Sequence, residues 1–364
     1  MFHGAFVLDS VLHAYNLTPE NQLFQPTSGA LSRMVWDMHL SAQPRGESRY
    51  VLERAKFEFA LDPEFLAHAV FAESETDAAI YHSIPLWGFY RDGLSPLWVG
   101  REMRKRYPGR VLLFGGVSPW QPGVLDEIDR LVEEDHVVGI KLYPEDIVDG
   151  RVKPWRADDA KVAFPIYERA LKNGIRSVAL HKAQPLGPVG IEPFKTADVS
   201  EAAIAFPELN FEIVHGGYAF MEETALQVAL FPNICINLEG TTGYLARQPR
   251  KFMEILGAML AAGGRDRLIW ATGAMLFHPQ PLLEAFWRAS MPRDLIENYG
   301  YPELTDEDKR AILGGNQLRL LGLEAAKLKA ASSKDRFSTR DQLAEPWSGP
   351  YAPPLRPADA AVMR

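Results

Sequence analysis

The sequence predicts a (β/α)8 barrel with an insertion after the first strand and with a C-terminal helix and tail. Short apolar runs alternate with longer amphipathic stretches up to about residue 323 of the 364 residues. Each run is rich in Val, Ile, Leu or Phe and ends at Gly, Pro, Ser or Thr, as buried parallel strands do. Eight such units match the size of a barrel. A doubly wound open sheet has the same alternation, but no glycine-rich phosphate-binding turn follows the first run.

The strands are expected at 5–12, 77–85, 110–118, 137–143, 176–182, 210–216, 233–239 and 267–273. The helices between them are expected at 121–135, 157–174, 198–206, 219–231, 249–263 and 279–290. In the stretch 157–174, Asp158 and Asp159 suit a first helical turn, and Asn173 followed by Gly174 suits a helix end.

The barrel domain is expected to span 1–323 and to contain an insertion at 20–76, with helices at 30–40 and 62–74. An insertion that leaves the C-terminal end of the first strand lies over the mouth of a barrel, so it could act as a lid. Residues 324–364 begin as an Ala/Lys helix and continue as a Pro-rich tail without the periodicity of a core element.

The composition limits the classes of partner. Lys and Arg number 39 against 47 Asp and Glu, a net charge of −8, which argues against a general nucleic-acid binder. Cys235 is the single cysteine and has no partner for an internal disulfide. The first residues lack the basic start of a signal peptide, and no apolar run approaches the roughly 18–20 residues of a membrane span. We therefore expect a cytoplasmic protein with a small-molecule substrate, no membrane association and an open choice between monomer and homodimer.

Polar side chains at the ends of the strands are the candidates for chemistry, because catalytic groups of parallel barrels project from these ends. They are His13, His82, Lys141, His181, His215 and Glu239. Neutral imidazoles that converge on one mouth suit metal binding or proton transfer.

Each candidate also has a structural interpretation. A single histidine at the end of a buried strand is more often a hydrogen-bonded core residue than a ligand. Lys141 could pair with an acid instead of neutralising substrate charge, and Glu239 could cap a helix. His278 precedes a proline where a helix begins, so capping competes with a substrate-binding role, which His82 would share.

Several motifs together resemble a known family. They are GIKLYP at 139–144, ALH at 179–181, VHGG at 214–217, LIWATGA at 268–274 and AILGGNQLRLLGL at 311–323. In this order they resemble the amidohydrolase-related TIM-barrel proteins that include aminocarboxymuconate-semialdehyde decarboxylase. The resemblance covers about residues 5–323 and implies the same barrel.

The resemblance also implies a metal site, from which this chain departs at two positions. The family's first strand ends Asp-x-His-x-His, where both histidines hold a divalent metal; here Val11 stands at the first and His13 at the second. The ligand on the fifth strand matches His181, and the histidine that activates water on the sixth strand matches His215. The aspartate of the eighth strand, a metal ligand and proton acceptor, is replaced by Gly273.

Of the four metal ligands in the family pattern, only His13 and His181 remain in this chain. A catalytic zinc site has about three protein ligands and an open position. Zn²⁺ could therefore bind His13 and His181 only if His215, Glu239 or His278 supplied a third ligand. The family also contains lactonases that need no metal, so a protein without a metal cofactor stays an alternative.

Three functions remain open at this point. The first is hydrolysis of a C–N or C–O bond in a small, cyclic or aromatic carboxylated compound. His215 would be its general base, and Lys141 and Glu239 would be further catalytic residues. The second is the non-oxidative decarboxylation that the named relative performs, which the loss of the aspartate disfavours. The third is a barrel that binds a ligand or a partner chain without turnover.

Overall fold

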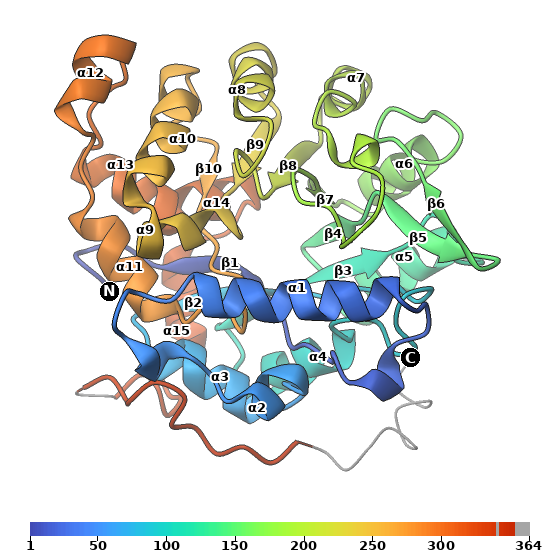
Figure 1. The fold of residues 1–364 in the computed structure, drawn as a ribbon, viewed down its shortest axis with the longest axis horizontal. Coiled ribbons are helices and arrows are strands. Elements are labelled where there is room, and N and C mark those ends of the chain that lie inside the picture. Colours follow the sequence, from blue (N-terminus) through green and yellow to red (C-terminus); the bar gives the residue numbers. More distant parts are fainter. Residues whose placement is uncertain (340–341, 354–364) are drawn as a thin grey trace.

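The computed structural model describes residues 1–339 and 342–353, and within them eight parallel strands form a barrel (Figure 1). The strands follow one another around the barrel in chain order: β1 Leu8–Leu12, β2 Ala78–His82, β3 Val111–Val117, β4 Gly139–Leu142, β7 Ser177–His181, β8 Asn210–Val214, β9 Ile234–Asn237 and β10 Leu268–Ile269. This confirms the predicted (β/α)8 barrel.

The last strand is short, and hydrogen bonds around it close the barrel. The Ser10 amide donates to the Trp270 carbonyl at 3.0 Å, and the His13 amide donates to the Ala274 carbonyl at 2.7 Å. The chain beyond β10 therefore continues alongside β1, which brings Gly273 to the same end of the barrel as His13.

The strands are continuous apolar runs because helices cover them on the outside and side chains fill the inside. Every residue of β1, β2, β4, β7 and β9 is buried. The surrounding helices are α4 Leu97–Arg106, α5 Val124–Glu133, α6 Phe164–Lys172, α7 Val199–Ala205, α8 Met221–Leu230, α9 Tyr244–Arg247, α10 Pro249–Ala261, α11 Pro279–Arg288, α12 Arg293–Tyr299, α13 Asp306–Arg310 and α14 Asn316–Leu320. Short 3-10 turns (η3 Glu192–Phe194, η4 Thr241–Gly243) and a π-helical turn (η5 Ala311–Gly315) join some of them.

The insertion after β1 contains η1 Pro19–Asn21, α1 Thr27–Ser41, η2 Ser48–Tyr50, α2 Arg54–Glu58 and α3 Pro63–Phe71. The start of α3 follows from its sequence: the Asp62 side chain accepts hydrogen bonds from the amides of Glu64 and Phe65, and Pro63 occupies the first helical position. Figure 1 shows α1 crossing in front of the barrel strands.

The structure differs from the sequence prediction in several places, and α2, α9, α12 and α13 are among the helices that were not expected. A hairpin of β5 Glu145–Val148 and β6 Arg151–Pro154 follows β4. Helix α4 was not predicted, because its sequence LWVGREMRKR is mostly polar. The expected helix 157–174 is reduced to α6, because hydrogen bonds to the Asp159 side chain and carbonyl hold 161–163 in turns.

The C-terminal segment packs against the insertion over its described residues. After α15 Ala325–Ser332, the chain runs beneath α3 and α2 (Figure 1). Trp347 lies against the rings of Phe65 and His278, and the Tyr351 hydroxyl donates to the Phe59 carbonyl at 2.7 Å. Two aromatic side chains thus anchor a segment that shows no core periodicity.

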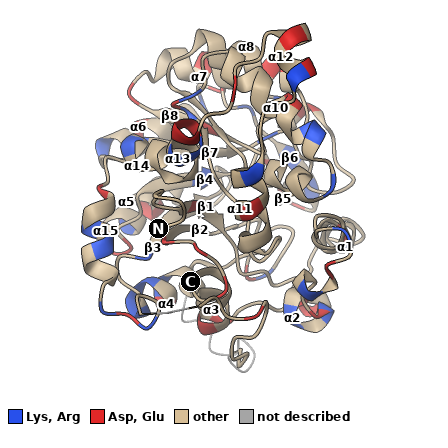
Figure 2. Cartoon of the chain, turned by 90° about the vertical axis from the view of Figure 1, so that its left-hand side faces the viewer, with Lys and Arg blue, Asp and Glu red and all other residues tan. Residues whose placement is uncertain are grey.

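Positive and negative side chains are interspersed over the outer helices (Figure 2), in keeping with the modest net charge of −8. Among the described residues, no helix combines the length and the hydropathy that crossing a membrane requires.

Candidate active site at the mouth of the barrel

Four of the residues singled out in the sequence surround one small cavity at the C-terminal ends of the strands. His13, His181, His215 and Glu239 line it, at or just beyond the ends of β1, β7, β8 and β9. The cavity has a volume of about 50 Å³. Because all strands run parallel, residues that are far apart in the sequence meet at this end.

Helix α1 forms the roof of this cavity. Leu31, Met34, Val35 and Met38 of α1 face the imidazoles across it. The insertion therefore lies over the mouth, as a lid would. The roof is apolar, so that the polar groups of the site lie on one side of the cavity and hydrocarbon on the other.

A chain of hydrogen bonds links three of the lining residues. Glu239 Oε2 is 2.7 Å from His215 Nδ1, and His215 Nε2 is 3.1 Å from His181 Nδ1. The chain ends at His181 Nε2, which donates to the Gln184 carbonyl at 2.8 Å. His215 adopts a left-handed backbone with φ of 64°, which turns its ring toward both partners.

The number of protons in this chain follows from its acceptors. The Gln184 carbonyl can only accept, so His181 carries a proton on Nε2. The Glu239 carbonyl, 3.0 Å from His215 Nδ1, can likewise only accept, so this nitrogen of His215 also carries a proton. The contact between the two rings needs a third proton. Burial, together with His215 and Lys141, holds the pKa of His181 well below 6.5. With His181 neutral, its Nδ1 accepts and His215 Nε2 is the donor between the two rings.

The electrostatics of Glu239 agree with this arrangement. Burial by itself would raise its pKa, but His215, through charge and hydrogen bonding, and then His13 and Lys141 hold the pKa of Glu239 below its usual value. Burial lowers the pKa of His13 to about 4, so this imidazole is neutral at pH 7. Its Nδ1 donates to the His82 carbonyl at 2.9 Å.

His82 and Lys141 are buried near this cavity but do not line it. The His82 ring stacks on Phe114 with centroids 4.5 Å apart, and among the described residues neither of its ring nitrogens has a hydrogen-bond partner. The Lys141 ammonium lies 5.0 Å from the centre of the Tyr143 ring. Burial lowers the pKa of Lys141 to about 7, against the opposing effects of Glu239 and Glu212.

Replacing Lys141 by Met is expected to stabilise the protein in a pH-dependent way. The unfolded chain keeps a lysine pKa near 10.4, about three units above the folded value. Between these values the unfolded state binds more protons, so the contribution of Lys141 to stability rises with pH. The gain of Lys141→Met over the native protein should therefore be largest at pH 7 and shrink toward pH 9. Urea unfolding at pH 7, 8 and 9 measures it.

The exposed Lys172 of α6 provides the control for this series. Lys172→Met should change the free energy of unfolding by the same small amount at each pH. A gain from Lys141→Met that is equally constant would contradict the assignment of a depressed lysine pKa.

His278 lies away from this cavity. Its ring contacts Glu73 at 3.1 Å through Nε2, and its Nδ1 accepts from the Gln280 amide at the start of α11. The structure therefore gives it a capping contact and a buried carboxylate as hydrogen-bond partner, and does not place it beside the other candidates.

Sequence reasoning missed Tyr15, Tyr143 and Gln184, which also line the cavity. Tyr143 stands two residues after Lys141, and this spacing places both side chains on the same face of a strand, which was an available signal. The Tyr143 ring stacks on His181 with centroids 4.7 Å apart.

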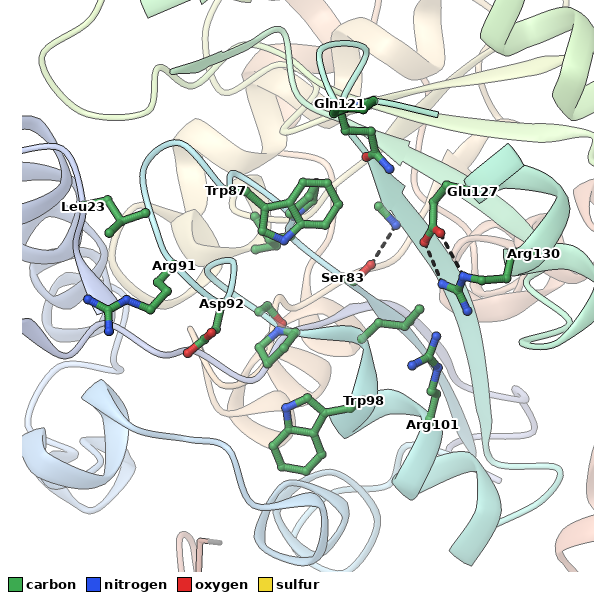
Figure 3. Close-up of a pocket in the computed structure, with 17 residues that line it drawn as sticks. Leu23, Ser83, Trp87, Arg91, Asp92, Trp98, Arg101, Gln121, Glu127 and Arg130 are labelled. Carbon is green, nitrogen blue, oxygen red and sulfur yellow. Dashed lines mark hydrogen bonds and ion pairs between the residues drawn. The ribbon is translucent and has the colours of Figure 1, made fainter. Parts of the chain in front are cut away.

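A larger cavity, of about 580 Å³, is lined by residues that include Ser83 and Trp87 (Figure 3). Trp87, Trp98, Arg101 and Arg130 line it, but its arginines are engaged: Arg101 pairs with Asp135, and Arg130 pairs with Glu127 at 2.6 Å. Ile84 borders both cavities, with Leu94 on the side of the histidines and Ser95 on the other side. The linked imidazoles and the carboxylate are all in the smaller cavity, which we therefore take as the candidate site.

The donors at the candidate site do not fit a divalent metal as they are arranged. Both ring nitrogens of His181 and both of His215 are taken up by the hydrogen-bond chain. In the described part of the chain, no group of three or more His, Cys, Asp or Glu side chains is placed to hold a metal ion. Val11 is apolar and Gly273 has no side chain, so neither supplies a ligand.

Comparison with known proteins agrees with this architecture. The family model described as amidohydrolase matches residues 60–323. No curated protein matches the chain at a significant level.

Solved structures of similar fold include three that cover most of this chain. An uncharacterised TIM-barrel protein of Bordetella bronchiseptica is 16% identical over 87% of this chain and 98% of its own, with a TM-score of 0.58. The 5-carboxyvanillate decarboxylase of Novosphingobium aromaticivorans, with bound manganese, is 14% identical over 88% and 98%, with a TM-score of 0.53. The 2,6-dihydroxybenzoate decarboxylase from Rhizobium is 15% identical over 88% and 98%, with a TM-score of 0.52.

At these identities the structural matches establish the fold, whereas the family model matches well over half of the chain. The chain belongs to the amidohydrolase family of TIM-barrel proteins.

Proposed function

We propose that the protein is a non-oxidative decarboxylase that acts on a small carboxylic acid, with the carboxylate on an aromatic or otherwise unsaturated carbon. The observation that carries the proposal is the position of the His215 ring, whose nitrogens lie 2.7 Å from Glu239 Oε2 and 3.1 Å from His181 Nδ1 at the wall of the cavity. Decarboxylation of such a compound needs one proton on carbon as the C–C bond to the carboxylate breaks, so that R–COO⁻ and H⁺ become R–H and CO₂.

The hydrogen bonds of His215 favour this reaction over hydrolysis. A general base for hydrolysis needs a free lone pair to accept a proton from water. If both of its ring nitrogens donate, as the contacts to Glu239 and His181 favour, His215 is an imidazolium without a free lone pair. Such a ring donates a proton, and Glu239 stabilises the charged form and orients the ring.

The other groups of the site suit a carboxylate substrate. The buried amine of Lys141, 5.0 Å from the centre of the Tyr143 ring that lines the cavity, can offset the negative charge of a carboxylate. The apolar roof of Met34, Val35 and Met38 disfavours a carboxylate and tolerates uncharged CO₂. The names of the two decarboxylases with the same fold support an aromatic acid as substrate.

The size of the cavity requires that the lid moves. A cavity of about 150 Å³ accommodates benzene, whereas the site cavity measures about 50 Å³. An aromatic acid therefore enters only when α1 shifts outward, and closure of α1 over it then excludes water.

The test is a turnover assay in D₂O on hydroxybenzoates with a ¹³C-labelled carboxylate, alongside aromatic lactones and amides. We expect labelled CO₂ and one deuterium at the carbon that carried the carboxylate. Hydrolysis of a lactone or amide without release of CO₂ would establish the hydrolase instead. Binding without turnover of any compound in either set would indicate a non-catalytic barrel.

A further inference from the structure

The space in front of Gly273 is occupied by the side chain of Glu239. A Cβ atom added to Gly273 would lie 2.4 Å from Glu239 Oε1 and 3.1 Å from Glu239 Cγ and Cδ. Contacts this short force a shift, and here the obstacle is a buried, hydrogen-bonded carboxylate. A side chain at 273 and the present position of Glu239 therefore exclude each other.

Glu239 is fixed in this position by the turn after β9. Its amide donates to Asn237 Oδ1 at 3.2 Å, and its carboxylate contacts His215 Nδ1 at 2.7 Å. Gly240 follows with φ of 73°, and a Cβ there would lie 2.7 Å from the same nitrogen of His215. The position of the Glu239 carboxylate thus depends on two glycines, Gly240 and Gly273, because a Cβ atom at either would be too close to Glu239 or His215.

The other buried carboxylate in this region is already engaged. Asp9 Oδ1 accepts from the Thr272 amide at 3.0 Å, and Asp9 Oδ2 accepts from the Thr272 hydroxyl. Burial raises the pKa of Asp9 to about 7 despite these bonds. Asp9 therefore braces the chain beside Gly273 and does not provide the charged partner of His215.

We infer that Glu239 and Gly273 form an exchange pair, in which the carboxylate of the site follows β9 and occupies the space that a side chain at position 273, on the segment after β10, would fill. Gly273 is then a positioning residue, because its lack of a side chain makes room for Glu239. The inference also explains why the donors do not form the expected metal site, since this carboxylate is turned to His215. Only the catalytic consequence rests on the proposed decarboxylase; the exclusion itself rests on the contacts.

Four proteins test the exchange pair by their melting temperatures: the native chain, Gly273→Asp, Glu239→Gly and the double variant. Gly273→Asp is expected to lower Tm by on the order of 10 °C, because it adds a clash and a second carboxylate. The double variant, which also lacks the Glu239 side chain, should regain most of the Tm that Gly273→Asp loses, even though it carries one substitution more. Additive losses, or a Gly273→Asp protein as stable as the native chain, would overturn the inference.

Gly300 offers a matched control for backbone strain. It has the same φ of 67° as Gly273, but a Cβ there would meet nothing within 4 Å. Gly300→Asp should lower Tm only slightly. In a protein that already carries Glu239→Gly, adding Gly273→Asp should lower Tm by no more than Gly300→Asp does. If Gly273→Asp does not fold, the same cycle with Gly273→Ala tests the exclusion, because a Cβ atom alone makes the 2.4 Å contact with Glu239. The melting cycle needs no substrate, so a failed CO₂ assay would leave its outcome unaffected.

Discussion

His215→Asn is expected to fold and to lose turnover by about 10²- to 10⁴-fold, the usual loss on removing a group that transfers a proton. Asn tolerates the left-handed backbone of His215, with φ of 64°, better than most residues, so it tests the ring with little strain. Without the imidazole, Glu239 and His181 each lose the hydrogen-bond partner that His215 provides. The measurement is kcat for CO₂ release, with thermal melting as the test of folding.

His136 allows the same substitution at an exposed site. It too has a positive φ, of 44°, and its ring contacts only the Val132 carbonyl of its own turn. His136→Asn should leave kcat unchanged. A fully active His215→Asn enzyme would contradict the proton-transfer role, and an unfolded one would indicate a structural histidine.

Glu239→Gln separates these two results if His215→Asn does not fold. The amide keeps the size of the side chain but removes the charge that stabilises the imidazolium. We expect kcat to fall while the melting temperature changes little. An unchanged kcat would count against a charged His215 at this site.

Glu73→Ala is expected to destabilise the protein by about 2–4 kcal/mol and to release the C-terminal segment. The buried carboxylate of Glu73 accepts from the amides of Trp347 at 2.7 Å and Ser348 at 2.8 Å, and contacts His278 Nε2 at 3.1 Å. Its loss leaves His278 Nε2 without a partner and removes the acceptor of the Trp347 amide. Urea unfolding measures the first effect, and limited proteolysis of 342–353 measures the second.

Glu345 lies on the same segment and is 84% exposed, so it provides the control. Glu345→Ala should change stability by less than about 0.5 kcal/mol, as surface substitutions usually do. Equal proteolysis of the two variants would show that Glu73 does not hold the segment.

The barrel itself could be predicted from the sequence because its signals are local. A buried parallel strand is a short apolar run, and the next helix shows its own periodicity, so the alternation identifies both. Parallel strands also place all their C-terminal ends at one mouth, and for this reason His13, His181 and His215 could be grouped before any coordinates were known. The motifs also show that Val11 and Gly273 stand where the family has a histidine and an aspartate that hold the metal.

The contacts that give the site its chemistry could not be predicted in this way, because they join residues distant in sequence. Which way Glu239 turns depends on the absent side chain of Gly273, on the segment that follows β10. His278 was a candidate for the site until the fold paired it with Glu73, 205 residues away. The roof of α1 depends on how a long insertion folds back over the mouth. Sequence determined the barrel and the end of it that bears the histidines, and only tertiary packing decided which side chains meet there, because local periodicity carries no information about distant partners.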